Sequence, residues 1–327
     1  MRPISIALVL VGVLATVGSF AWGRDIFVNN LSGDDRFTGH QRTTSSDGAG
    51  PVRTIEKALR LAQQGDRIEV ENTGEPYRES LSLMGRRHSG YPGQPLVLNG
   101  HGAVLDGTAP VPPNAWEHFG ARRTNGSTSS DGWLSVFRFQ PPRVQFQQLF
   151  LGGRPAPCVA ANPAADAPPK LEPLQWCLHR GYIYYAVERN KLPADYPLTY
   201  ASRPAGISLL AVQHVVIQDF VIQGYHLDGI NALESCRMVH LIRVTCRGNG
   251  RSGIAVGGAS LVDIEQSRIG DNGYAQLLTR PWSETHLRDT ELISNTAPAW
   301  VDEGGKVFRD GQEIRGGLDE FAPPKRP

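Results

Sequence analysis

The chain has 327 residues, with 33 Lys and Arg against 32 Asp and Glu, and 40% of its residues are hydrophobic. This composition excludes a globally disordered chain, which needs low hydrophobicity and high net charge, and the net charge of +1 argues against nucleic-acid binding through bulk positive charge. The 36 Gly and 24 Pro residues indicate many turns and favour a β-rich protein over a helical bundle.

Residues 1–23 have the features of a signal peptide. Arg2 supplies the positive charge, the apolar run from Ile4 to Val17 is too short for a comfortable membrane span, and small residues at Ala21 and Gly23 suit cleavage. An uncleaved anchor is the alternative. No later segment is apolar enough over a sufficient length to stop transfer. We therefore expect a secreted, periplasmic or cell-surface protein with no stable membrane span after cleavage.

Residues 24–107 begin with a short strand at 25–29 and contain one clear helix. Thr54 is a good N-cap, the apolar residues from Ile55 to Ala62 follow a helical stripe, and Gly65 ends the helix. A strand is expected directly afterwards, at 67–70. This order predicts a helix that leads into the first β-structure of the chain.

Residues 108–200 form a different region, rich in proline and aromatic residues. Alternating runs such as 133–139, and the pieces 148–154 and 181–185, read as hairpin strands. This pattern predicts an inserted small β-module. Its aromatic residues could stack on sugars or fill a small core of the module; these include Trp116, Trp133 and Trp176.

Residues 201–305 repeat at a period of 22–25 residues. Three series share this period: Gly-Ile pairs that begin at Gly206, Gly229 and Gly253; the apolar residues Ile217, Ile242, Ile264 and Leu287; and Asn249, Asn272 and Asn295. Such a period indicates a solenoid, propeller or array, and each repeat holds only short strands. One coil of a β-helix per repeat explains the pattern, with Ile ladders inside and Asn ladders at a turn. A β-sandwich leaves the Asn register unexplained.

At Pro51–Leu59, Gln64–Val70 and Arg247–Ile254 the chain resembles the pectin lyase-like family of right-handed parallel β-helices. In that family the first two stretches form a capping helix and the first coil, and the third is a turn and strand of a later coil. The resemblance covers 25–107 and 201–305. It implies an all-β fold, a right-handed parallel β-helix solenoid with an N-terminal cap helix and an inserted β-module. The family includes lyases, hydrolases, epimerases and non-catalytic proteins, so the fold leaves the activity open.

The four cysteines are an even number, which permits two disulfides in an exported chain. No C-x-x-C occurs, so a zinc site is not favoured. A bridge between Cys158 and Cys177 would close a loop within the module and is the preferred pairing. Cys236 and Cys246 could form a second bridge or be buried thiols.

Polar residues near the Gly-Ile pairs are candidates for chemistry. A polysaccharide lyase needs a cation that neutralises a uronate and a base that removes a proton, and 206–305 contains no Lys. His226 near Arg251 is compatible with this reaction. A glycoside hydrolase needs two carboxylates less than about 10 Å apart. Asp228 and Glu234 lie too far apart along one extended strand, so Asp228 would need a partner from the insert.

We therefore predict a protein that acts on or binds a polysaccharide, as a lyase or glycoside hydrolase. The alternative is a non-catalytic cell-surface or glycan-binding solenoid. The predicted catalytic residues are Asp228, His226 and Arg251, with Glu234 in reserve, and the predicted substrate-binding residues are Tyr225, Asn231, Tyr274 and Arg237.

No cofactor is expected, and the partner expected is a polysaccharide bound by a monomer. Calcium needs several clustered oxygen ligands, and the spread of Asp263, Glu265 and Asp271 makes only a weak case for it. In the last segment, 306–327, the stretch 307–314 reads as a hairpin with an Asp310-Gly311 turn. We expect this hairpin to fold back over the last coil.

Overall fold

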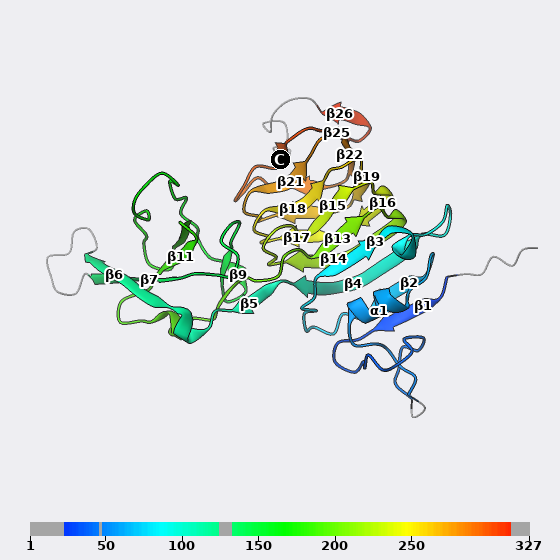
Figure 1. Ribbon diagram of the computed structural model, residues 1–327, viewed down its shortest axis with the longest axis horizontal. Helices are drawn as coiled ribbons and strands as arrows, with labels where there is room; N and C mark the ends of the chain where they lie inside the picture. Colours follow the sequence, from blue (N-terminus) through cyan, green and yellow to red (C-terminus); the bar gives the residue numbers. More distant parts are fainter. Residues whose placement is uncertain (1–22, 46–47, 124–132, 315–327) are drawn as a thin grey trace, which may run out of the picture.

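The computed structural model describes residues 23–45, 48–123 and 133–314. These residues form an almost all-β molecule with two parts, a stack of coils and a module beside it (Figure 1). The stack is a right-handed parallel β-helix, as predicted. Residues 1–22, which make up nearly all of the predicted signal peptide, lie outside the described residues.

One face of the stack is a parallel sheet of six strands among the described residues. Its order is β3 (Leu81–Met84), β13 (Ile207–Leu210), β15 (Ile230–Glu234), β18 (Ser252–Val256), β21 (Ala275–Thr279) and β24 (Trp300–Asp302). The predicted ladder is confirmed, because Ile207 pairs with Ile230 and Ile230 pairs with Ile254, and all three side chains are fully buried. Like side chains therefore stack on like at the spacing between parallel strands, about 4.8 Å.

The other two faces belong to a twelve-stranded sheet. Its main path runs β1 (Asp25–Val28), β2 (Arg67–Val70), β4 (Leu96–Asp106), β14 (Gln213–Gln223), β16 (Arg237–Ile242), β19 (Leu261–Glu265), β22 (Ser283–Arg288), β25 (Gly305–Arg309) and β26 (Gln312–Ile314). A branch holds β17 (Thr245–Arg247), β20 (Arg268–Gly270) and β23 (Glu291–Leu292). The first part of β14 pairs with β16 and its last part with β17, so the sheet bends within β14.

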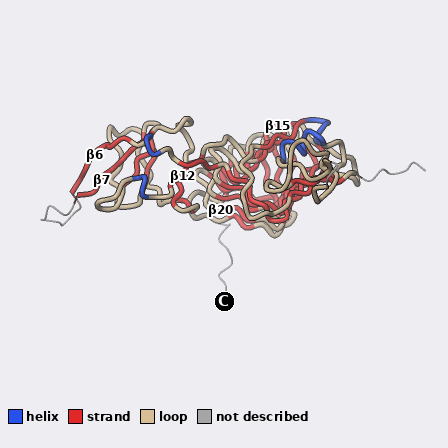
Figure 2. Tube along the Cα trace, turned by 90° about the horizontal axis from the view of Figure 1, so that it is seen from below, coloured by secondary structure: helices blue, strands red, loops and turns tan. Residues whose placement is uncertain are grey.

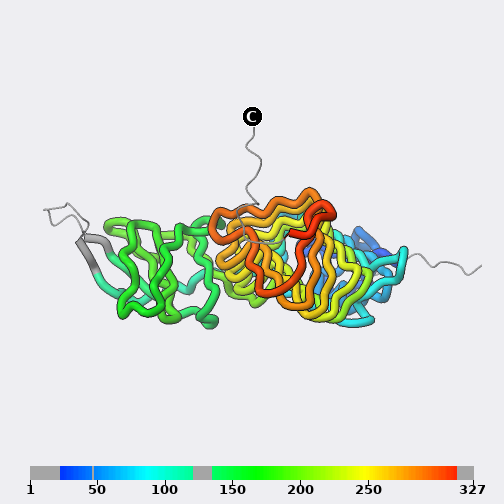
Figure 3. Tube along the Cα trace, turned by 90° about the horizontal axis from the view of Figure 1, so that it is seen from above, coloured from blue at the N-terminus to red at the C-terminus, as the bar shows by residue number. Residues whose placement is uncertain are grey.

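The bend is made by a residue in the left-handed conformation, Asp219, with φ of 58°. The equivalent residue of the next coil, Arg243, has φ of 51° and donates through Nε to an Asp219 carboxylate oxygen at 2.6 Å. A left-handed residue turns the chain sharply without adding length. This corner separates the two faces of the twelve-stranded sheet, and Figure 3 shows the successive coils lying one against the next.

Helix α1 (Ile55–Leu61) lies where the sequence predicts it, although it ends earlier than Gly65. The Thr54 side chain accepts a hydrogen bond from the Lys57 backbone N–H, and the Glu79 carboxylate accepts from the Ile55 and Glu56 backbone N–H groups. Ile55, Ala58 and Leu59 are buried in the core of the stack. Its role as an end cap stays a prediction. Three short 3-10 turns also occur, η1 (Gly85–His88), η2 (Pro113–Ala115) and η3 (Pro193–Asp195).

The insert leaves and rejoins the stack through neighbouring antiparallel strands. Its first sheet contains β5 (Thr108–Pro110), β12 (Leu198–Ala201), β8 (Leu149–Leu151) and β9 (Arg154–Pro155), and its second contains β10 (Trp176–His179), β11 (Tyr182–Ala186), β7 (Trp133–Phe139) and β6 (Glu117–Arg123). The module projects to one side of the stack (Figure 2). Trp116 and the fully buried Trp176 pack in a core of its own, so these two fill the module.

Two predicted ladders are shifted at single positions. Leu241, rather than Ile242, pairs with Ile217 and with Ile264. In the Asn ladder, the Asn249 amide donates to Asn272 at 3.0 Å, as predicted, whereas Asn295 pairs with Asp271, and Thr296 takes the next place by donating to the Asn272 carbonyl. Turns of unequal length move one residue out of register, and a shift of one residue turns a side chain to the other face.

The predicted C-terminal hairpin is present, in a different place. Strand β25 joins the twelve-stranded sheet parallel to β22, and β26 pairs antiparallel with β25 around the Asp310-Gly311 turn. Val307 is fully buried in the core of the stack, and Ile314 packs against that core. The hairpin therefore extends the stack by one rung.

The structure corrects the predicted disulfides, because all four cysteines are free thiols. Cys158 is opposite Trp176 in a parallel bridge, so the neighbouring Cys177 side chain points to the other side of the strand. Cys177 packs with Leu171 and Tyr184 in a separate cluster. Cys236 and Cys246 are buried inside the stack, where burial raises the pKa of both thiols.

Candidate functional site

The predicted corner brings three of its residues into one buried network. The Asp228 carboxylate is fully buried and accepts hydrogen bonds from Arg251 at 2.9 and 2.5 Å and from the Ser252 hydroxyl at 2.6 Å. The Asn231 amide donates to it at 3.4 Å. The Arg251 side chain is only 13% exposed. Each oxygen of Asp228 is thus engaged within the protein, which describes a structural ion pair better than an available base.

His226 lies beside this network under a segment of the insert. The backbone carbonyls of Phe146 and His226 approach Gly250 so closely that a side chain there would clash. Burial lowers the pKa of His226, the Gln145 backbone raises it, and Arg143 and Arg251 lower it further. The insert therefore closes this corner, and burial there favours the uncharged form of the ring.

The other predicted residues are dispersed. Tyr225 is fully buried and its hydroxyl donates to the Glu79 carbonyl at 2.5 Å, which leaves no surface for a substrate. Glu234 ends β15 and Arg237 begins β16, both exposed at the opposite corner of the coil. Tyr274 is 41% exposed and lies at an open groove. The structure thus separates Glu234 and Arg237 from the Asp228 network.

The groove beside Tyr274 lies between the module and the stack and has a volume of about 1220 Å³. Phe146, Phe150 and the stretch 152–161 line the module side. Gly248, Gly250 and Gly273 line the stack side, where a side chain would meet the module or a neighbouring coil. Glycines at this corner therefore let the module and the next coil pack directly against the stack at the floor of the groove.

Two arginines give the groove a positive lining. Arg154 enters from β9 and Arg247 from β17, and both are exposed. The Arg247 Nε donates to Gln223 at 2.9 Å, and the Gln223 amide donates to Asp106 at 3.2 Å. This chain across three coils fixes the direction of the Arg247 guanidinium. Asp271, also at the groove, accepts from Asn295 at 2.6 Å.

The groove also offers aromatic surface. The Phe146 and Tyr274 rings meet edge to face with their centroids 5.9 Å apart. The Tyr274 hydroxyl lies 3.5 Å from a Glu303 carboxylate oxygen. Planar apolar rings beside amides and guanidinium groups can bind a ligand that has both apolar faces and polar edges.

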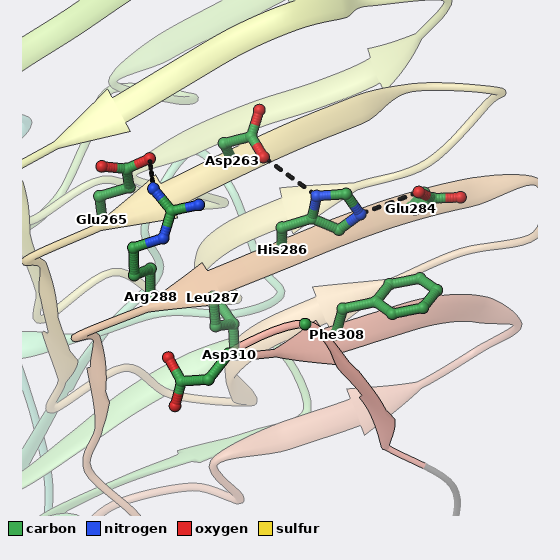
Figure 4. Close-up of a pocket in the computed structure, with 9 residues that line it drawn as sticks. Asp263, Glu265, Glu284, His286, Leu287, Arg288, Phe308 and Asp310 are labelled. Atoms are coloured by element: carbon green, nitrogen blue, oxygen red, sulfur yellow. Dashed lines mark hydrogen bonds and ion pairs between the residues drawn. The ribbon is translucent and has the colours of Figure 1, made fainter.

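A second charged cluster lies on the outer side of β19 and β22 (Figure 4). The His286 ring lies between two carboxylates, with Nδ1 3.1 Å from Asp263 and Nε2 2.8 Å from Glu284. Only the protonated ring can donate to both. Arg288 donates to Glu265 at 3.0 Å, and these residues line a hollow of about 640 Å³. His240 lies 3.5 Å from the other oxygen of Asp263.

Sequence reasoning missed both the groove arginines and the His286 cluster, although a signal for the cluster was available. His240, Asp263 and His286 are spaced by 23 and 23 residues, which is the period of the coils, and they pair directly in the sheet. The groove lacks such a signal, because Arg154 and Arg247 come from two regions with unrelated sequence patterns.

The described residues contain no group of three or more His, Cys, Asp or Glu side chains arranged to hold a metal ion. In the same part of the chain, no helix has the length and apolar character needed to cross a membrane.

No model of a known protein family and no curated protein matches the chain. Solved structures match it weakly. A complex of XylC with xylose is 12% identical with a TM-score of 0.40, over 87% of this chain and 69% of that one. The pectate lyase Pel9A is 10% identical with a TM-score of 0.34, over 91% and 80%. A rhamnogalacturonan lyase is 10% identical with a TM-score of 0.25, over 88% and 62%.

Likeness at this level says nothing about activity. The strand order and register of the chain itself identify it as a right-handed parallel β-helix protein, the fold of the pectin lyase-like family that its sequence resembles.

Proposed function

We propose that this protein binds an acidic polysaccharide in the groove between the module and the stack. The observation that carries the proposal is the lining of this groove, which Arg154 and Arg247 share with the exposed ring of Tyr274. Guanidinium groups match carboxylates in charge and geometry, and aromatic rings stack on the apolar faces of sugars. A polymer of uronic acids presents both features at each repeat.

The hydrogen bonds that Asp228 already accepts within the protein favour binding over cleavage at the predicted corner. Its carboxylate is held by Arg251 and Ser252, and a general base must reach the proton that it removes. The non-catalytic alternative is therefore the form of the proposal that the geometry supports best. The sequence of residues 1–23 supports export, so we place this binding outside the cytoplasm.

The proposal is tested by calorimetric titration of the protein with uronic-acid oligosaccharides and with neutral ones of equal length. We expect binding of the acidic set only, weakened by salt. Arg247→Ala should lower the affinity about tenfold or more, because a charge-assisted hydrogen bond contributes about 1.5–3 kcal/mol.

Arg237→Ala is the matched control, since Arg237 is an exposed arginine at the opposite corner. Equal affinity for neutral and acidic sugars, or an equal loss in both variants, would contradict the proposal. The same mixtures are followed for new double bonds and for reducing ends. If Asp228→Asn keeps turnover and Arg247→Ala loses it, the groove is also a catalytic site. If Asp228→Asn loses turnover while its thermal stability is unchanged, the catalytic site lies at the predicted corner instead.

A further inference from the structure

One corner of the stack carries a tryptophan where neighbouring coils carry small residues. The equivalent residues are Ala211, Ser235, Ala259, Trp282 and Gly304, all with positive φ. Trp282 has φ of 70° and is 87% exposed. A bulky residue is unfavourable in this conformation, and an exposed indole gains no burial in return. Neither the coil geometry nor the core explains a tryptophan at this place.

The turn that carries Trp282 is firmly held. The Arg280 backbone N–H donates to Val256 at 2.9 Å, and the Glu284 backbone N–H donates to Ser260 at 2.9 Å. Between them, the Ser283 hydroxyl donates to the Arg280 carbonyl at 2.7 Å. The indole is therefore presented on a rigid support, which reduces the entropy lost when a ligand binds to it.

A chain of polar side chains runs from the groove to Arg280, two residues before Trp282. The Arg280 Nε lies 3.2 Å from a Glu303 carboxylate oxygen, and the other carboxylate oxygen lies 3.5 Å from the Tyr274 hydroxyl. Tyr274 precedes β21 and Trp282 follows it, so the two aromatic side chains stand at opposite ends of the same strand. The residues of β21 are buried, so a ligand that leaves the groove passes over Tyr274, Glu303 and Arg280 toward the turn that carries Trp282.

The surroundings of Trp282 indicate which ligand it suits. Membrane insertion needs several apolar side chains side by side, and a protein interface needs a broad patch. The turn of Trp282 instead begins at Arg280, whose ion pair with Glu303 has both side chains more than a third exposed. One flat apolar ring next to hydrogen-bonding groups matches a single sugar ring, which has an apolar face and hydroxyl groups at its edge.

We propose that Trp282 is a stacking subsite for one sugar ring of the polysaccharide that occupies the groove. This inference rests on the proposed function. It predicts that binding at Trp282 depends on the length of the oligosaccharide. A short oligosaccharide fills the groove without reaching Trp282, whereas a longer one contacts both.

The test compares Trp282→Gly with the parent protein in titrations with short and long uronic-acid oligosaccharides. Glycine adopts positive φ without strain, so the variant should keep the melting temperature. We expect about tenfold weaker binding of the long oligosaccharides and unchanged binding of the short ones. Tyr91→Ala is the control, because Tyr91 is 50% exposed at the other end of the stack. Trp176 also lines the groove, so the fluorescence change of Trp282 is taken as the difference between the parent and Trp282→Gly, and we expect this difference with long oligosaccharides only.

Equal binding of long oligosaccharides by Trp282→Gly and the parent would overturn the inference while leaving the groove intact, provided that Arg247→Ala still weakens binding. An equal loss for short and long oligosaccharides would also overturn it. Loss of binding to anionic vesicles by Trp282→Gly, without a loss for oligosaccharides, would reassign Trp282 to a membrane surface. If the parent binds no oligosaccharide of any length, the proposed function fails first, and this inference with it.

Discussion

The stack and the module are both made of short strands, yet they are held together in different ways. In the stack, the strands from β13 to β25 pair in parallel about one repeat apart, β3 and β4 pair in parallel with β13 and β14 across the insert, and one continuous core runs from Ile26 to Val307. In the module, antiparallel neighbours enclose small separate cores around Trp176 and Cys177. In a repeat, the partner of a residue can be predicted by adding one repeat length to its number. In the insert, no fixed spacing predicts which residues are in contact.

The largest effect expected is the loss of the stack on a buried charge. Ile230→Asp places a carboxylate in the ladder between Ile207 and Ile254 and should cost about 5 kcal/mol or more, enough to unfold the domain. Ile183→Asp makes the same change in the module core. If the two cores are independent, only the module signals of an NMR spectrum should collapse in the second variant. Collapse of the stack in both would show one cooperative unit.

The Asp228 network should behave as structure rather than as catalyst. Asp228→Ala leaves the Arg251 guanidinium buried without its partner and should lower the free energy of unfolding by about 3–5 kcal/mol. Urea unfolding measures this loss. The double variant with Arg251→Ala should be less destabilised than the sum of the two single changes. Additive losses would mean that the pair does not interact.

His226 should make stability depend on pH where the insert crosses the stack. Because burial lowers its pKa in the folded state, the unfolded chain binds the extra proton first, and stability falls as the pH falls below the ordinary value of about 6.5. His226→Gln should reduce the stability lost between pH 7.5 and about pH 5.5. His40→Gln, at an exposed position, serves as the control. If His226→Gln leaves the dependence of stability on pH unchanged, the insert does not bury this ring.

The smallest effect concerns the surface cluster around His286. The ring contacts Asp263 through Nδ1 and Glu284 through Nε2, and half-exposed pairs contribute about 0.2–1 kcal/mol. His286→Gln should therefore lower the free energy of unfolding, measured in urea, by about 1 kcal/mol or less. Glu265, Arg288, His240 and Asp310 lie in the same cluster or line the same hollow. A loss of several kcal/mol would contradict a merely superficial role for this cluster.

The amino-acid sequence by itself determined the β-helix, the helix after Thr54 and most of the ladder register. These features depend on contacts between residues that are near in sequence or one period apart, so spacing alone reveals them. Ile207, Ile230 and Ile254 stack as their spacing predicts. The one-residue errors at Ile242 and Asn295 have the same origin, because spacing does not show in which turn an extra residue is placed.

Only the tertiary structure decided the candidate site. The spacing of the repeats predicted that Asp228 and Arg251 lie at one corner. It could not show that the insert covers that corner, or that Arg251 donates hydrogen bonds to both carboxylate oxygens of Asp228. Nor could it bring Arg154 to Arg247, because their proximity depends on how a non-repeating module packs against the stack. Such packing is set by many weak contacts between distant segments, and no local pattern in the chain encodes their sum.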